Sequence, residues 1–292
     1  MTEPITIIEC PRDAWQGLPH QIPPETKAAY LRQLIRAGFT HADAVSFVSP
    51  SAVPQMADSE RVLELLGPAT GIEIIGIVVN EKGATRAIDT GKVNTLGFPY
   101  SISPEFLRRN QNQTEKESLN ILGAITALAE DSGRNVVAYV SMAFGNPYGD
   151  PWSIGAVLHA CRQLAGLGIL QISLADTVGV ATPSQIAETV QAAIDASEGA
   201  HIGVHLHARR NNAPSLIRAA YFAGCRRFDS AIGGLGGCPF AQDDLVGNIP
   251  TEVLVATLTE CGASIPALGL DDQLIASSNR IAADASSQIS PQ

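Results

Sequence analysis

Short runs of β-branched and other apolar residues alternate with longer segments of helical periodicity along the whole chain. Each of the eight runs is followed by an amphipathic stretch, of which Glu25–Ala37 and Ser184–Ala196 are examples. The predicted strands are Ile5–Cys10, His41–Phe47, Ile72–Val79, Lys92–Phe98, Asn135–Phe144, Ile169–Ala175, His201–His207 and Arg227–Ile232. Apolar strands separated by helices indicate a parallel sheet that is buried on both faces.

Eight such units in 292 residues favour a closed (β/α)8 TIM barrel over an open doubly wound sheet. The open Rossmann-like sheet is the alternative. The sequence motif typical of that fold is missing here, because the first strand is followed by Pro11-Arg12-Asp13 and not by the GxGxxG loop of dinucleotide-binding proteins. We expect one domain over residues 1–292, with an eighth barrel helix near Asn248–Cys261, an extra C-terminal helix over Leu270–Ala285 and a frayed tail at 286–292.

The formal net charge of −10 excludes a non-specific DNA or RNA binder, because such a protein needs a basic face to displace counterions from phosphates. The five cysteines are scattered and contain no CxxC pair, which is typical of reduced thiols. No apolar stretch approaches the roughly 20 residues that span a bilayer, and the first residues do not resemble a signal peptide. We expect a cytoplasmic protein without a nucleic-acid or membrane partner.

Polar residues that follow the strands are the candidates for chemistry, since TIM barrels carry their active sites at the C-terminal ends of the strands. The seventh strand ends in His205-Leu206-His207, whose period of two points both imidazoles to one side. Arg12-Asp13 follows the first strand and offers a fixed cation beside a carboxylate. This mixed nitrogen and oxygen set suits Mg, Mn, Co or Zn.

Each of these signals also has a structural explanation. An HxH pair on a strand is a core or hydrogen-bonded pair about half the time, and an Arg-Asp dipeptide is usually a surface salt bridge or helix cap. The functional interpretation is favoured because both fall at the same face of the predicted barrel, together with Asp176 after strand six and Asn248.

A glycine-rich loop, Gly233–Phe240, carries Cys238 to the same face. A thiol beside a metal-bound substrate can give or take a proton. The other interpretation is a phosphate-binding or turn glycine cluster with an incidental cysteine.

With these motifs the chain resembles the 3-hydroxy-3-methylglutaryl-CoA lyase family. That family lies in the metal-dependent barrel superfamily that also holds isopropylmalate synthase, homocitrate synthase and pyruvate carboxyltransferase domains. The matching segments are Pro11–Asp13, Ser46–Pro50, Val53–Met56, Tyr139–Ser141, Ser173–Gly179, His205–His207, Gly234–Ala241 and Gly247–Asn248. The cysteine loop is the most specific of them, because the synthases share the Arg-Asp and HxH elements.

The resemblance implies a carbon–carbon lyase that cleaves a 3-hydroxyacyl-CoA to acetyl-CoA and a keto acid. An aldolase or Claisen-type synthase with the same metal chemistry is one alternative, and a non-catalytic barrel that binds an acyl-CoA or organic acid is another. The resemblance further implies a divalent ion, Mg or Mn, and a homodimer is compatible with the helical surface of such barrels.

The resemblance also implies roles for individual residues. The ligands of the ion would be Asp13, His205, His207 and Asn248; Arg12 would stabilise the enolate oxygen; Cys238 would be the acid; Asp176 or His205 would be the base; and Arg12, Gln16, Asp43, Ser46 and Ser173 would contact the substrate.

The chain departs from the lyases most clearly after the Arg-Asp pair. Where they have Gly-Leu-Gln-Asn-Glu-Lys, this chain has Ala14–Pro19. Asp43 stands where the family has Glu, and Ala208 where it has Asp. The bulky Trp15 in the changed segment suggests a pocket for a larger or more apolar acyl chain than methylglutaryl.

Overall fold

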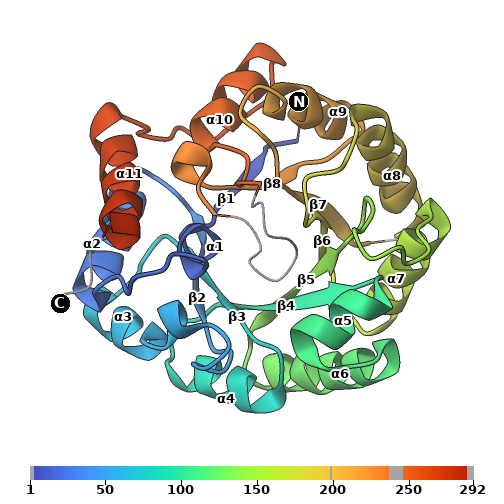
Figure 1. Cartoon of the computed structure of the whole chain (residues 1–292), viewed down its shortest axis with the longest axis horizontal. Coiled ribbons are helices and arrows are strands. Elements are labelled where there is room, and N and C mark those ends of the chain that lie inside the picture. Colours follow the sequence, from blue (N-terminus) through green and yellow to red (C-terminus); the bar gives the residue numbers. More distant parts are fainter. Residues whose placement is uncertain (1–2, 198, 237–245, 288–292) are drawn as a thin grey trace.

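The computed structural model of this chain describes residues 3–197, 199–236 and 246–287. Eight parallel strands pair in chain order and close into a barrel, which confirms the predicted TIM barrel (Figure 1). The strands are β1 (Thr6–Glu9), β2 (His41–Ser46), β3 (Glu73–Ile77), β4 (Thr95–Ser101), β5 (Asn135–Ser141), β6 (Gln171–Asp176), β7 (His201–Leu206) and β8 (Arg227–Ser230).

Most of the helices form a ring around the strands, while α1 lies inside that ring beside β1 and β2, as Figure 1 shows. They are α1 (Pro11–Gln16), α2 (Pro24–Arg36), α3 (Ser59–Leu66), α4 (Glu81–Asp89), α5 (Pro104–Gln111), α6 (Glu115–Asp131), α7 (Ile154–Gly166), α8 (Pro183–Ala196), α9 (Ala213–Phe222), α10 (Thr251–Glu260) and α11 (Asp272–Ser287), with short 3-10 turns η1 (Pro54–Met56) and η2 (Ile232–Gly234). Within the described ranges no helix is long and apolar enough to cross a membrane.

The predicted boundaries differ from the observed ones by up to three residues. The largest difference is in β4, which begins at Thr95 and continues through Pro99 to Ser101 in register with β5. The predicted extra C-terminal helix is present as α11. It includes Ser286 and Ser287, so the helix extends two residues into the segment expected to be frayed.

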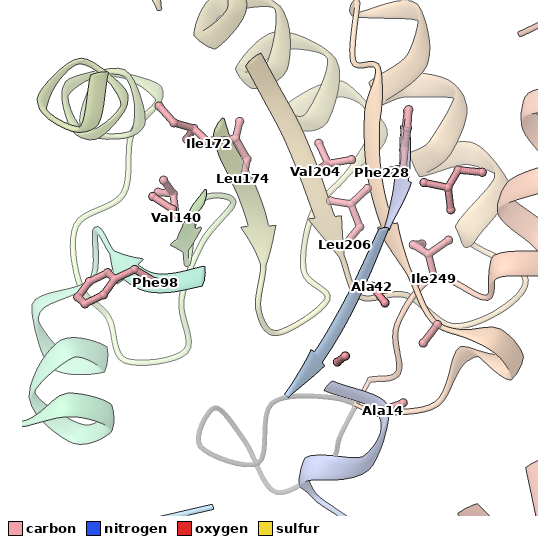
Figure 2. Close-up of a cluster of buried hydrophobic side chains, with 14 of the residues drawn as sticks. Ala14, Ala42, Phe98, Val140, Ile172, Leu174, Val204, Leu206, Phe228 and Ile249 are labelled. Carbon is pink, nitrogen blue, oxygen red and sulfur yellow. The ribbon is translucent and has the colours of Figure 1, made fainter. Parts of the chain in front are cut away.

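The strands alternate between two buried layers. Outward residues such as Val140, Leu174 and Val204 belong to the large cluster beneath the helices (Figure 2). Inward residues such as Ile8 and Tyr139 form a smaller cluster inside the barrel. The period of two along each strand therefore decides which side chains reach the barrel axis.

Candidate active site

The first part of the site is α1, a single short helix that begins at Pro11 directly after β1. Proline is favoured at this first helical position because its fixed φ suits the helix and its missing N–H is not needed there. The next residues form a compact hydrogen-bonded group: Nη1 of Arg12 donates to Asp13 Oδ1 at 3.2 Å and to Gln16 Oε1 at 2.9 Å, and Gln16 Nε2 donates to Asp13 Oδ1 at 2.7 Å.

Arg12 is anchored from the neighbouring strand β2. Its Nε donates to Asp43 Oδ1 at 3.1 Å, and its Nη2 donates to Asp43 Oδ2, so the pair is bidentate. Burial alone would lower the pKa of Arg12, but the carboxylates of Asp43 and Asp13 outweigh it and raise that pKa above its ordinary value. The guanidinium is therefore a permanent, fixed positive charge at the mouth of the barrel.

The second part of the site comes from β7. His205 and His207 point to the same side, and their Nε2 atoms lie 3.2 Å apart. On the other side of each ring, His207 Nδ1 lies 3.1 Å from the backbone oxygen of Thr177, and His205 Nδ1 lies 3.2 Å from Asp229 Oδ2. Since a carbonyl oxygen and a carboxylate only accept, both contacts place a ring proton on Nδ1, and in the neutral form of each ring Nε2 then carries a lone pair.

Two nitrogen lone pairs at this distance repel each other unless a proton or a metal ion lies between them. Two nitrogen ligands about 2.1 Å from one ion, at right or tetrahedral angles, lie about 3.0 to 3.4 Å apart, which brackets the observed separation of the His205 and His207 Nε2 atoms. Asp13 adds a carboxylate, with Oδ2 3.7 Å from His207 Nε2. One ligand atom of each of these three residues lies within 4.8 Å of the others, so the donor set fits a divalent ion.

The electrostatics of the cluster favour a cation as well. Burial alone would raise the pKa of Asp13, but the neighbouring His207 imidazole and the charge of Arg12 hold it well below its usual range. Burial alone would lower the pKa of His205, but the hydrogen bond to Asp229 and the charge of Asp13 raise it. Asp13 is therefore ionised, and the site carries the negative charge that a metal ion requires.

Asn248 borders the same cluster. Its Nδ2 donates to Asp13 Oδ2 at 2.7 Å and to the backbone oxygen of Leu235 at 2.8 Å, while its Oδ1 is buried without a hydrogen-bond partner. Amide oxygen and nitrogen are assigned from such contacts, and either orientation leaves a polar atom of Asn248 beside Asp13. A bound ion gives the oxygen the partner it lacks, so Asn248 fits the fourth predicted ligand position.

A second group of potential ligands lies deeper, formed by Cys10, His205 and Asp229. Burial raises the pKa of the Cys10 thiol well above its usual value, with the charge of Asp229 adding to the effect. A protonated thiol is a poor ligand, because metals bind the thiolate. The cluster of Asp13 with the two Nε2 atoms is therefore the better candidate for the metal centre.

A cavity opens above this cluster at the C-terminal ends of the strands. Its polar lining includes Arg12, Asp13, Gln16, Ser46, His205 and His207. Its walls are largely apolar, with Val48, Val53, Ile77, Pro99 and Phe106 among them. The cavity thus combines an apolar chamber with a cation and potential metal ligands on one side, which is suited to a small acyl group that carries oxygen atoms.

Residues 5–279 match the HMGL-like family. The chain belongs to the HMGL-like family. It is 33% identical over 257 residues to the hydroxymethylglutaryl-CoA lyase of Bacillus subtilis, covering 88% of this chain and 85% of that one. It is also 33% identical to the human mitochondrial hydroxymethylglutaryl-CoA lyase, covering 88% of this chain and 79% of the human protein. These similarities confirm the predicted family, and they confirm the prediction that the chain is a carbon–carbon lyase.

Solved structures agree with this membership. An HMG-CoA lyase from Acinetobacter baumannii in complex with coenzyme A and 3-methylmalate superimposes with a TM-score of 0.89 at 33% identity, covering 99% of this chain and 95% of that one. The carboxyl transferase domain of Rhizobium etli pyruvate carboxylase shares the fold at 14% identity, with a TM-score of 0.72 over 97% of this chain and 47% of that one.

The other predicted site residues of this HMGL-like chain lie further from the cavity. Asp43 is fully buried behind Arg12. Ser173 lies on the barrel floor, with its Oγ 3.5 Å from Asp229. Asp176 accepts backbone hydrogen bonds from Val180 and Ala181, each at 3.0 Å. None of the three is among the residues that line the cavity in the described part of the chain. Cys238 lies outside the described residues.

Trp15 requires a correction. Its side chain is 1% exposed and packs edge-on against Tyr30 of α2, with ring centres 5.6 Å apart. Trp15 is not among the cavity residues, so it anchors α1 to the helical layer and does not shape the cavity. The apolar lining of the cavity includes Val48, Val53 and Phe106 instead.

Sequence reasoning missed the residues that hold the two histidines. The backbone oxygen of Thr177 and the carboxylate of Asp229 each accept from an imidazole, and Arg227 lies beside Asp229. The period of two that revealed the histidine pair also places Arg227 and Asp229 on one side of β8. That alternation is a signal in the sequence by which both residues could have been found.

Proposed function

We propose that this chain is a divalent-metal-dependent lyase that cleaves 3-hydroxy-3-methylglutaryl-CoA, or a related 3-hydroxyacyl-CoA, to acetyl-CoA and a keto acid. The observation that carries the proposal is the convergence of Asp13, His205 and His207 beside Arg12 in one cavity. The relatives are named hydroxymethylglutaryl-CoA lyases, and one related structure holds coenzyme A. The assignment of Mg or Mn to the site belongs to the same proposal.

The residues that would hold the ion are Asp13, His205, His207 and Asn248. When bound, a divalent ion supplies a Lewis acid that polarises the hydroxyl and the forming carbonyl of the substrate. Carbon–carbon cleavage then leaves the bonding electrons on the carbon next to the thioester carbonyl, and the oxygen of the resulting enolate gains negative charge. Arg12 is the only arginine or lysine among the cavity residues of the described chain, and Asp43 fixes its position. We assign to Arg12 the stabilisation of that oxygen.

Two proton transfers complete the reaction: the hydroxyl loses a proton, and the enolate carbon gains one. Of the two predicted bases, His205 lines the cavity, whereas Asp176 does not and accepts backbone hydrogen bonds from Val180 and Ala181. His205 can take the hydroxyl proton only while its Nε2 is not bound to the ion, and each Asp176 oxygen keeps a free lone pair, so both residues remain our candidates for the base. Cys238 remains our candidate for the acid that protonates the enolate.

The direct test is an assay of the purified protein with 3-hydroxy-3-methylglutaryl-CoA and added Mg²⁺ or Mn²⁺, with acetoacetate and acetyl-CoA measured separately. Both products should appear in equal amounts and disappear with a chelator. An Asp13→Ala variant is the matched control, because it removes a ligand from the same cavity. If the protein cleaves only a longer 3-hydroxyacyl-CoA and not 3-hydroxy-3-methylglutaryl-CoA, the longer compound is the substrate.

Two other outcomes correspond to the alternative functions. Condensation of acetyl-CoA with a 2-oxo acid, without cleavage of any 3-hydroxyacyl-CoA, would indicate a Claisen-type synthase. Binding of an acyl-CoA by folded, metal-loaded protein without any turnover would indicate a non-catalytic barrel. Either result would contradict the lyase proposal.

A further inference from the structure

A row of buried charged side chains continues from His205 down into the barrel. Asp229 Oδ2 lies 3.2 Å from His205 Nδ1, and Asp229 Oδ1 lies 3.0 Å from Arg227 Nη1. The exposed fractions of His205, Asp229 and Arg227 are 7%, 3% and 7%, so solvent does little to stabilise their charges. An unpaired buried charge is costly, and the mutual contacts of these three groups therefore define their arrangement.

The sheet register brings the three residues together. His205 is opposite Asp229 and Gly203 is opposite Arg227 where β7 pairs with β8. A Cβ atom at Gly203 would lie only 3.1 Å from the Cβ, Cγ and Cδ atoms of Arg227. Because Gly203 has no side chain, the aliphatic part of the Arg227 side chain can pass across β7 at this position.

Tyr139 of β5 closes the arrangement from the opposite side. Its ring centre lies 5.8 Å from Cζ of Arg227 and 5.9 Å from the ring centre of His205, which it meets edge-on. Gly97 of β4 leaves space for this ring, because a Cβ atom there would lie 3.2 Å from Tyr139 Cε2. Arg227 and His205 are therefore both held against the same aromatic side chain.

We propose that Asp229 and Arg227 are positioning residues that determine which nitrogen of His205 faces the reaction. The Nδ1–H of His205 donates a hydrogen bond to Asp229, so Nε2 with its lone pair points to the cavity. Arg227 holds the other oxygen of the Asp229 carboxylate and fixes its orientation. The inference rests on the metal site proposed above. Arg227 itself lies outside the cavity lining of the described chain, so it acts through Asp229 and not on the substrate.

The test is Arg227→Met, which removes the charge and keeps an unbranched side chain of similar length. The readout is the affinity of the metal-free protein for Mn²⁺, followed by electron paramagnetic resonance without substrate. Losing a residue that orients a metal ligand weakens binding by about 10- to 100-fold, and we expect a loss in this range. Arg227→Lys should recover part of it, because the positive charge is restored.

Two further variants separate positioning from simple loss of stability. Gly203→Ala leaves the charge intact but displaces the arginine stem, and it should also weaken Mn²⁺ binding. Val137→Ala removes bulk from the same interior cluster without touching the charged row, and its Mn²⁺ affinity should match that of the parent. If Arg227→Met and Gly203→Ala weaken binding no more than Val137→Ala, the positioning role is wrong.

A measurement on the unaltered protein keeps the inference testable if a variant fails to fold. Nitrogen-15 NMR of the metal-free protein should show the ring proton of neutral His205 on Nδ1, with the signal identified by its loss in His205→Asn. A proton on Nε2 would overturn the inference while leaving the lyase assay unaffected. Failure of the parent protein to bind Mn²⁺ would instead overturn the metal site itself.

Discussion

Glu9 at the end of β1 provides a quantitative prediction about stability. Its side chain is 1% exposed, and it accepts hydrogen bonds from the backbone N–H of Ile232 at 2.8 Å and from Thr251 Oγ1 at 2.6 Å. Burial raises the pKa of Glu9 from 4.5 to about 8, against the opposing effect of these hydrogen bonds. The carboxyl group is therefore protonated in the folded state at neutral pH and ionised in the unfolded state.

The sign of the pH dependence follows from this difference. Between 4.5 and about 8 the folded state holds one more proton than the unfolded state, so stability falls as the pH rises. One pH unit corresponds to about 1.4 kcal/mol, so the shift from 4.5 to about 8 corresponds to about 5 kcal/mol in total. This contribution is fully present below the unfolded pKa and is lost once the pH exceeds the folded pKa.

Glu9→Gln reproduces the protonated state, because its amide oxygen can accept from Ile232 and its amide nitrogen can donate to Thr251. The free energy of unfolding of this variant, measured by urea titration, should rise relative to the parent by about 1.4 kcal/mol per pH unit between about pH 5 and pH 8, and then level off. Glu105→Gln is the control: hydrogen bonds from Arg108 and Arg109 lower the pKa of Glu105 to about 2, so its effect should not vary over this range. A constant difference for Glu9→Gln would refute the reasoning.

Three further predictions concern the site and the barrel interior. Asp13→Ala should abolish measurable Mn²⁺ binding, because it removes the only carboxylate of the three-residue cluster; calorimetry on the folded variant tests this. Arg12→Lys should lower kcat about 100-fold with little change in Mn²⁺ affinity, since an ammonium cannot make the bidentate contact with Asp43; equal losses in both quantities would contradict the assigned role. Gly97→Ala places a Cβ atom 2.6 Å from Ile77 Cδ1, so thermal unfolding should show a loss of about 1 to 3 kcal/mol, and an unchanged Tm would show that the interior adapts without cost.

The barrel and its histidine pair could be predicted from the sequence because both depend on simple periods. Strands and helices alternate eight times, and two side chains separated by one residue on a strand share a face. Asp229 and Arg227 follow the same rule, but their partners lie on other strands. Asp229 lies beside His205 because of the register in which β7 pairs with β8, and this register cannot be predicted from the periodicity of either strand.

Trp15 illustrates a different limit. The sequence predicts that the bulk of Trp15 shapes the acyl pocket, but Trp15 lies in the helix α1. Two residues along a helix correspond to a rotation of about 200°, so Trp15 leaves the face that Asp13 occupies. Neighbours in the sequence therefore have separate tasks, with Asp13 in the cavity and Trp15 against Tyr30.

The packing of α1 couples catalysis to the outer shell of the barrel. Arg12 and Asp13 are consecutive residues of one turn, so the proposed oxyanion cation and the proposed metal ligand move as a unit. The contact of Trp15 with Tyr30 holds that unit against α2. Selection at the contact between α1 and α2 can thus tune the reaction while every residue in the cavity stays the same.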